Sequence, residues 1–165
     1  MTGITLSIDI QDAGAAKVLD RVIAAAEDLT PAMDDIGGHL VAAIQRRFEL
    51  GRGPDGKPWK PSRRVEESKG GGQTLVDSGR LMQSVTHLAH ADSVDVGTNV
   101  IYGAIHQFGG TIRAKKGKAL AFGSGAGKVL RNSVTIPARP FLGLDADDKA
   151  EIAVIVRDHI ERAMA

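Results

Sequence analysis

The chain of 165 residues contains no cysteine. This absence excludes disulfides, thiolate zinc sites and a cysteine nucleophile, and it suits a protein that is assembled in a reducing cytosol. No window approaches the roughly 20 consecutive apolar residues of a membrane span. The first ten residues also lack the basic segment and apolar run of a signal peptide. We therefore expect a soluble protein with no membrane partner.

Aromatic residues are scarce, which makes the single tryptophan and the single tyrosine conspicuous. Tyr102 lies in the stretch Ile-Tyr-Gly-Ala-Ile-His-Gln-Phe-Gly-Gly at residues 101–110. Its apolar residues have helical spacing, so we expect a short buried helix that ends at the two glycines. Trp59 lies between Pro58 and Pro61, where it either anchors a partner or folds back onto the core.

The hydrophobic pattern predicts an α+β fold in one domain spanning residues 1–165. Apolar residues alternate at residues 4–10, which indicates a strand. Residues 12–29, 30–51 and 145–165 have the apolar spacing of helices, with Thr30 and Asp145 as expected caps. Shorter elements are expected as helices near 78–82 and 101–108 and as strands at 85–89, 93–97, 110–113, 119–122 and 130–136.

These elements predict a mostly antiparallel sheet or a small sandwich packed against two or three helices, with long basic loops. The first helix should turn one apolar side toward the rest of the protein; its members are Ala15, Val18, Leu19, Val22, Ile23, Ala26 and Leu29. The last helix should bury a similar stripe, formed by Ile152, Ile155, Val156, His159, Ile160 and Ala163.

Two segments, 51–74 and 111–131, are expected to contain flexible loops, because they are rich in glycine and charge and the first also in proline. The first should hold no regular structure, whereas in the second the Lys- and Gly-rich stretches should be turns between the expected strands. The second carries six basic residues and no acid, whereas residues 1–35 carry seven acids and two bases. This distribution allows three interpretations: solvated loops, a nucleic-acid contact, or copies that meet acidic face to basic face. The candidate contacts with DNA or a partner are Arg52, Lys57, Lys60, Arg63, Arg64, Lys115, Lys116 and Lys118.

Catalytic, metal and cofactor motifs are incomplete. Residues 51–56 spell a dinucleotide fingerprint, but they follow a helix rather than a strand. His87 and His90 are three apart in an expected strand, so their side chains should point to opposite faces. His106 and Gln107 could serve as general base and oxyanion donor, but no serine lies in a nucleophile elbow. We expect no enzyme activity, metal or cofactor, and interpret His106 as a hydrogen-bonded packing residue.

A series of short motifs runs from the middle of the chain to its end. In chain order these are Pro54-Asp55-Gly56 and Trp59; Leu75 and Ser78-Gly79-Arg80-Leu81; Val96-Gly97-Thr98, Tyr102 and Ile105-His106-Gln107-Phe108-Gly109-Gly110; and Pro137-Ala138-Arg139-Pro140-Phe141-Leu142-Gly143. Together they resemble the phage virion morphogenesis family, which includes Mu-like tail completion or head–tail joining proteins.

The resemblance implies a non-enzymatic virion protein at the neck or tail end. It is expected to assemble in the host cytoplasm as a ring of identical subunits, such as a hexamer. Its implied partners are neck, connector and tail tube proteins, and DNA in the channel. The residues expected at subunit contacts or in the structural motif are Trp59, Tyr102, His106, Gln107, Phe108, Arg113, Arg139, Pro140 and Phe141. The alternatives are a nucleic-acid-binding module that uses the basic loops and, third, a small hydrolase built on His106.

Overall fold

The computed structural model describes residues 13–68, 71–115, 119–122 and 129–165. The strand expected at 4–10 and the candidate contacts Lys116 and Lys118 lie outside these residues.

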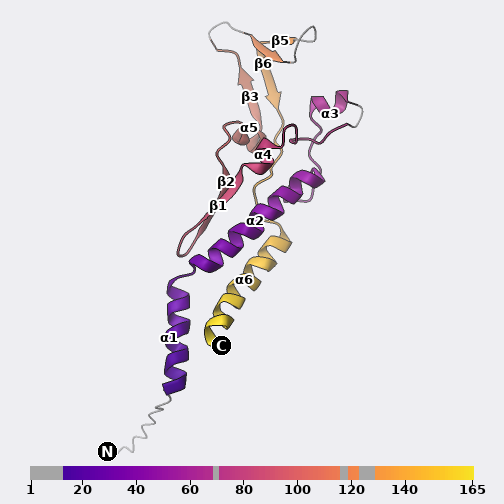
Figure 1. The fold of residues 1–165 in the computed structure, drawn as a ribbon. Coiled ribbons are helices and arrows are strands. Elements are labelled where there is room, and N and C mark those ends of the chain that lie inside the picture. Colours follow the sequence, from indigo (N-terminus) through magenta and orange to yellow (C-terminus); the bar gives the residue numbers. More distant parts are fainter. Residues whose placement is uncertain (1–12, 69–70, 116–118, 123–128) are drawn as a thin grey trace, which may run out of the picture.

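Three long helices make up much of an elongated molecule (Figure 1). They are α1 (Ala13–Glu27), α2 (Thr30–Leu50) and α6 (Ala146–Met164), and α6 packs along both α2 and α1. Pro31 lies in the first turn of α2, where its missing N–H costs nothing. Thr30 is the first residue of α2 rather than its cap, and its N–H donates to the Asp28 carboxylate at 3.0 Å. Asp145 caps α6 as expected.

The strands form three separate antiparallel pairs. These are β1 (Val85–Ala89) with β2 (Val94–Thr98), β3 (Gly110–Arg113) with β6 (Ser133–Ile136), and β4 (Leu120–Phe122) with β5 (Val129–Arg131). The α+β class and the antiparallel pairing are therefore confirmed. Among the described residues there is no single sheet or sandwich, because the strand expected at 130–136 breaks at Asn132 and its halves pair with different partners.

The β1–β2 hairpin packs on α2, whereas the β3–β6 ribbon extends away from the helices (Figure 1). Three short helices complete the described fold: α3 (Arg63–Glu67), α4 (Arg80–Gln83) and α5 (Gly103–Phe108). The expectation that 51–74 holds no regular structure was wrong at α3, and Arg52 also forms an isolated bridge with Pro58. The remaining described part of that segment is irregular.

The core lies where the C-terminal half of α2 meets α4, β1 and residues 137–143. Phe48 and Phe141 are completely buried, with ring centroids 5.2 Å apart. Trp59 packs edge-on against Phe48 at 5.4 Å, so it folds back onto the core. Each such aromatic side chain stabilises the fold by about 2–3 kcal/mol through burial.

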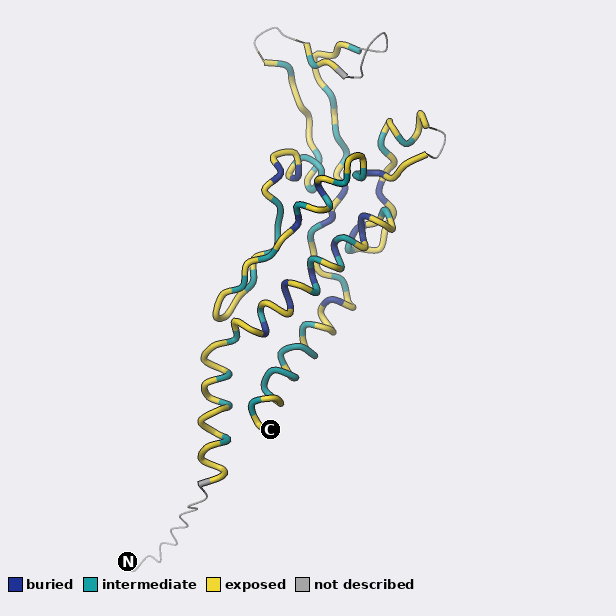
Figure 2. The backbone as a smooth tube through the Cα atoms, viewed as in Figure 1, coloured by how far each residue is buried: buried dark blue, intermediate teal, exposed yellow. Residues whose placement is uncertain are grey.

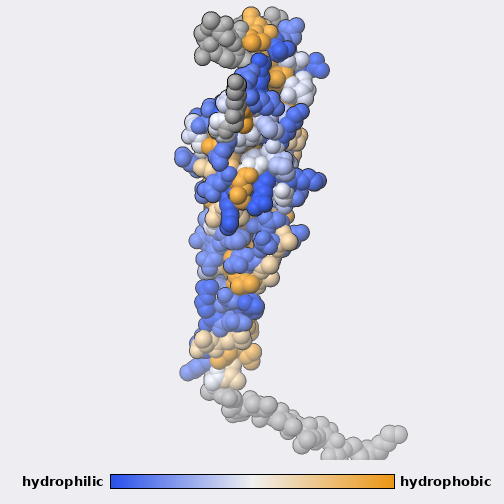
Figure 3. All heavy atoms as spheres, turned by 90° about the vertical axis from the view of Figure 1, so that its right-hand side faces the viewer, coloured by the Kyte–Doolittle hydropathy of each residue, from blue (hydrophilic) through white to orange (hydrophobic). Residues whose placement is uncertain are grey.

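Burial decreases toward the N-terminal end of the molecule (Figure 2). None of the described α1 side chains is buried, and Leu19 and Ile23 are 61% and 55% exposed. The stripe expected to be buried on α6 is only half-buried. The expected burial of α1 and of α6 required other parts of the protein to cover the apolar side of each helix. Instead, α1 packs mainly on α6. In the space-filling view, hydrophobic residues form several separate patches along the molecule (Figure 3).

Candidate functional site

The two most characteristic motifs, 101–110 and 137–143, meet in space. We call α5 together with residues 137–143 the motif junction. The Gln107 side chain joins its two halves: Oε1 accepts the N–H groups of Phe141 and Leu142 at 2.9 and 3.0 Å, and Nε2 donates to the Leu142 carbonyl at 3.0 Å. One amide therefore satisfies three backbone groups of a segment that forms no helix or strand.

The loop around Trp59 holds the other side of residues 137–143. Trp59 Nε1 donates to the Pro140 carbonyl at 2.9 Å. The Arg139 guanidinium donates to the carbonyls of Lys60 and Pro61 at 2.7 and 3.1 Å, while its backbone N–H donates to the His106 carbonyl at 2.7 Å. Trp59, Arg139, Pro140 and Gln107 thus cooperate in one rigid connection.

Gly109 lets the two halves approach closely. Its φ is +69°, in the region that favours glycine, and a Cβ built there would lie 2.6 Å from the Ala138 nitrogen. The end of α5 can therefore reach residues 136–138 only with glycine at this position.

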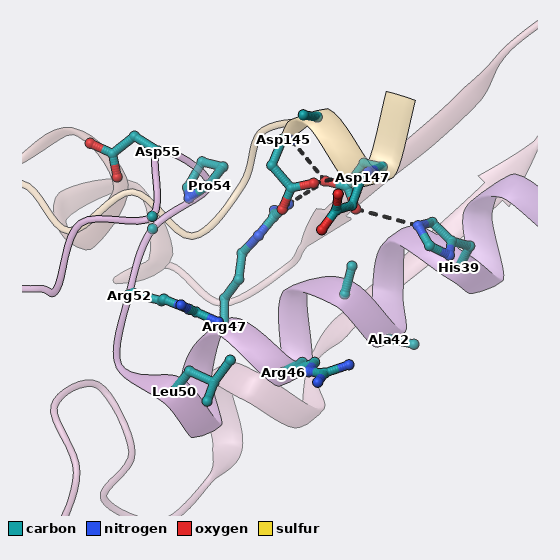
Figure 4. Close-up of a pocket in the computed structure, with 15 residues that line it drawn as sticks. His39, Ala42, Arg46, Arg47, Leu50, Arg52, Pro54, Asp55, Asp145 and Asp147 are labelled. Carbon is teal, nitrogen blue, oxygen red and sulfur yellow. Dashed lines mark hydrogen bonds and ion pairs between the residues drawn. The ribbon is translucent and has the colours of Figure 1, made fainter. Parts of the chain in front are cut away.

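A buried ion-pair cluster anchors the end of the junction to α2 and α6 (Figure 4). Arg47 donates to the Gly143 carbonyl at 2.7 Å and to Asp145 at 3.0 Å, and it pairs with the buried Asp148. Asp145 and Asp148 also form a reciprocal capping box at the start of α6. The N–H of Asp148, together with Arg47, lowers the pKa of Asp145. An open pocket of about 730 Å³ adjoins this cluster.

The acidic residues at the start of the last helix, Asp147 and Asp148, were expected to favour the helix N-terminus, but the ion pair between Arg47 and Asp148 was not foreseen. Two signals were available: Arg47 lies three residues after Ile44 on the apolar side of α2, and Asp148 stands at the capping-box position relative to Asp145. A charged residue on a buried helix face requires a partner of opposite charge.

The side-chain hydrogen bond that we expected of His106 is not made to any described residue. Its Nδ1 is buried without a hydrogen-bond partner in the described part of the chain. Burial, followed by the charge of Arg139, lowers the pKa of His106, which favours the neutral imidazole. The Tyr102 ring packs edge-on against it at 6.1 Å.

Ile101 and Tyr102, which precede α5, and Phe108, its last residue, face outward, contrary to the expectation of a buried helix. Ile101 is 97% exposed, Phe108 78% and Tyr102 42%, and Gly103 is the one buried residue of α5. The reason is that Gln107 and Gly103 occupy the inward side, where Gly103 comes close to Leu81 and Phe141. We call the surface formed by Ile101, Tyr102 and Phe108 the α5 face.

The candidate basic contacts are all exposed where they are described: Arg52, Lys57, Lys60, Arg63, Arg64 and Lys115. Several already have local partners. Arg63 pairs with Glu67, and Arg64 donates to the carbonyls of Gln73 and Val76 and so holds its own loop. Arg113 is the last residue of β3, and Lys115 lies two residues beyond it.

Within the described ranges, no group of three or more His, Asp or Glu residues is placed to hold a metal ion. His87 and His90 each face a carboxylate instead, Asp34 at 2.9 Å and Asp95 at 3.1 Å. No described helix is long and apolar enough to cross a membrane.

Fold and site define a small α+β protein that presents an apolar face from a tightly connected junction. The chain belongs to the phage virion morphogenesis family, whose model matches residues 10–161. It is 33% identical over 157 residues to "Mu-like prophage FluMu G protein 2" of Haemophilus influenzae, covering 94% of this chain and 96% of the relative. It is 28% identical over 132 residues to "Putative capsid assembly protein G" of Escherichia phage Mu, covering 76% and 75%.

No solved structure matches the chain significantly. Family membership confirms the resemblance seen in the motifs and gives the chain a role in the assembly of phage virions.

Proposed function

We propose that this chain is a structural, non-enzymatic protein of the virion that completes the tail or joins it to the head. It acts at the neck or tail end as a ring of identical subunits, such as a hexamer, assembled in the host cytoplasm. Its partners are neck, connector and tail tube proteins. The observation that carries the proposal is the α5 face: Ile101 and Phe108 are exposed beside the most firmly connected part of the fold.

The geometry favours a contact surface over a catalytic one. Large exposed apolar side chains are characteristic of protein interfaces when they gather in one place. A fixed backbone beneath them lowers the entropy lost on binding. A hydrolase would instead need His106 hydrogen-bonded to a nucleophile, and no such bond to a serine is found among the described residues.

A ring requires each subunit to present two different surfaces, because head-to-tail contacts that close make rings. The α5 face serves as one of them. The described parts toward the two ends of the elongated molecule differ in charge, since residues 13–35 carry five acids and two bases, whereas residues 111–115 and 129–131 carry three bases and no acid. Different ends of this kind suit heterologous contacts and disfavour pairing of like surfaces.

The test is a phage in which the gene for this chain is disrupted and then supplied in trans. We expect electron micrographs of the disrupted phage to show separate heads and tails or tails with defective ends, and infectivity to return with the wild-type gene. Joined, infectious particles in the absence of the chain would refute the proposal.

A second candidate function, a nucleic-acid contact, is favoured by the described end of the β3–β6 ribbon. Arg113, Lys115 and Arg131 are exposed there, and no ion pair involves them among the described residues. Binding of a DNA duplex should then weaken steeply with salt. Absence of binding at low salt would remove this candidate.

A further inference from the structure

A second pocket opens beside the α5 face. It has a volume of about 320 Å³ and is lined by segments far apart in sequence: Ser62 and Arg64, residues around α4, Tyr102 and His106 of the α5 region, and Arg139. We call it the Arg139 pocket.

Two residues that line this pocket each have a buried polar atom without a partner among the described residues. Ser62 Oγ and His106 Nδ1 are both buried without a hydrogen bond to any described residue. Buried polar groups nearly always have a partner, and these two line the same pocket. The pocket therefore has room for a further polar group beside two residues whose hydrogen-bonding capacity is unused.

The charge of Arg139 also lacks a close partner in the described part of the chain, because Glu66, the carboxylate that acts on it, lies beyond ion-pairing distance. Arg139 is only 5% exposed and donates to two carbonyls, but no carboxylate of the described chain lies within ion-pairing distance of it. Arg47, equally buried, shows the usual arrangement, because it pairs with Asp145 and Asp148. Buried charges are normally paired. Arg64 and Arg80 add positive charge to the lining, and the one acid there, Asp77, is 85% exposed and lies near Arg64.

We propose that the Arg139 pocket receives a carboxylate from α1 of a second copy of this chain, while apolar residues next to that carboxylate pack on the α5 face. The contact rests on the proposed ring. A carboxylate accepts hydrogen bonds from serine and from guanidinium groups and supplies the missing negative charge. A DNA backbone would match the charge but offers little to cover the apolar side chains of Ile101 and Phe108.

Helix α1 presents the complementary surface. Leu19 and Ile23 are exposed, and Asp20 between them makes no ion pair with any described residue. Asp20 lies on α1, which also carries Glu27, Lys17 and Arg21, and α1 lies well away from α4 and α5 (Figure 1). Each copy therefore offers a pocket at one place and a carboxylate at another, as a head-to-tail contact requires.

Self-association of the full chain, measured by sedimentation velocity over a range of concentrations, tests the contact. Arg80→Glu places a negative charge in the lining at an exposed residue, and Arg63→Glu makes the same charge change outside the pocket. We expect Arg80→Glu to weaken association at least about tenfold and Arg63→Glu less than about twofold, with both variants folded by circular dichroism. The double variant Arg80→Glu with Asp20→Arg should recover most of the association, because the pair is then reversed in sign.

Three results would overturn the inference: a wild-type chain that stays monomeric, equal effects of the two single variants, or no recovery in the double variant. Loss of binding to a DNA duplex in Arg80→Glu, with association unchanged, would assign the pocket to phosphate instead. None of these results changes the disrupted-phage experiment, so the ring contact and the role in tail completion can fail separately.

Discussion

Gln107 holds Phe141 through a hydrogen bond of 2.9 Å from the Phe141 N–H to the Gln107 Oε1. The two residues are 34 positions apart in the chain. Phe141 is fully buried against Phe48, so this bond connects α5 to the core of the protein. Phe108, the next residue of α5, points about 100° away from Gln107 around the helix axis, and its side chain is 78% exposed.

Replacing Gln107 should cost the fold more than its partial exposure suggests. Gln107→Leu leaves the N–H groups of Phe141 and Leu142 without their acceptor. We expect a loss of about 3 kcal/mol in the free energy of unfolding, measured with chemical denaturant. Gln83→Leu, at an exposed residue of α4, is the matched control and should change stability by less than about 0.5 kcal/mol. Equal effects of the two changes would contradict the role of Gln107.

Gly109→Ala should destabilise the protein for two reasons, the positive φ and the clash with Ala138. We expect a loss of roughly 3 kcal/mol or more in the free energy of unfolding. Gly51→Ala separates the two, because Gly51 has a φ of +64° but nothing within 4 Å of the added Cβ. It should cost only about 1 kcal/mol. A Gly109→Ala variant as stable as Gly51→Ala would contradict this expectation, because it would show that residues 136–138 shift at little cost to make room for the added Cβ.

The stabilisation that Asp145 gives to the N-terminus of α6 should be lost at acid pH. The pKa of Asp145 is lowered from its ordinary value of 3.8, chiefly by the N–H of Asp148. A lowered folded-state pKa stabilises the protein above the unfolded pKa, and this contribution is lost as pH falls through the folded pKa. Asp145→Asn keeps a cap but does not titrate. Unfolding free energies measured from pH 6 to pH 2 should therefore show the advantage of wild type over Asp145→Asn shrinking below about pH 4.

Asp35→Asn, at an exposed residue of α2, is the control for this comparison. Its difference from wild type should vary less over the same pH range. A constant difference between wild type and Asp145→Asn would contradict the interaction of Asp145 with the capping box.

The α5 face should matter for assembly and little for folding. Phe108→Asp alters a side chain that is 78% exposed, so the free energy of unfolding should change by less than about 0.5 kcal/mol. We expect the same variant, supplied to phage lacking the wild-type gene, to yield at least about tenfold fewer joined particles, because hot-spot aromatics contribute about 2 kcal/mol or more to a contact. Leu88→Asp, 61% exposed on β1, should leave particle numbers near wild type. Equal losses in the two variants would remove the α5 face from the proposed ring.

Much of the fold could be predicted from local patterns. The bounds of β1 and β3 and the Asp145 cap agree with the structure, because period-two alternation, turns and caps act over a few residues. The sequence could not decide whether Trp59 anchors a partner or packs on the core, because proline-rich neighbours occur both in free loops and in packed ones. The Arg139 pocket was not predicted either, because its lining comes from four separate segments.

The sequence by itself determined the family, the α+β class and the long helices, since these depend on short motifs and on hydrophobic periodicity. The tertiary structure decided which side of α5 is buried. Helical spacing shows that Ile101 and Phe108 share a side with other apolar residues, but it does not say whether that side meets the core or the solvent. The hydrogen bonds of Gln107 to residues 141 and 142 make that choice, because a polar side chain with three backbone partners must point inward to reach them.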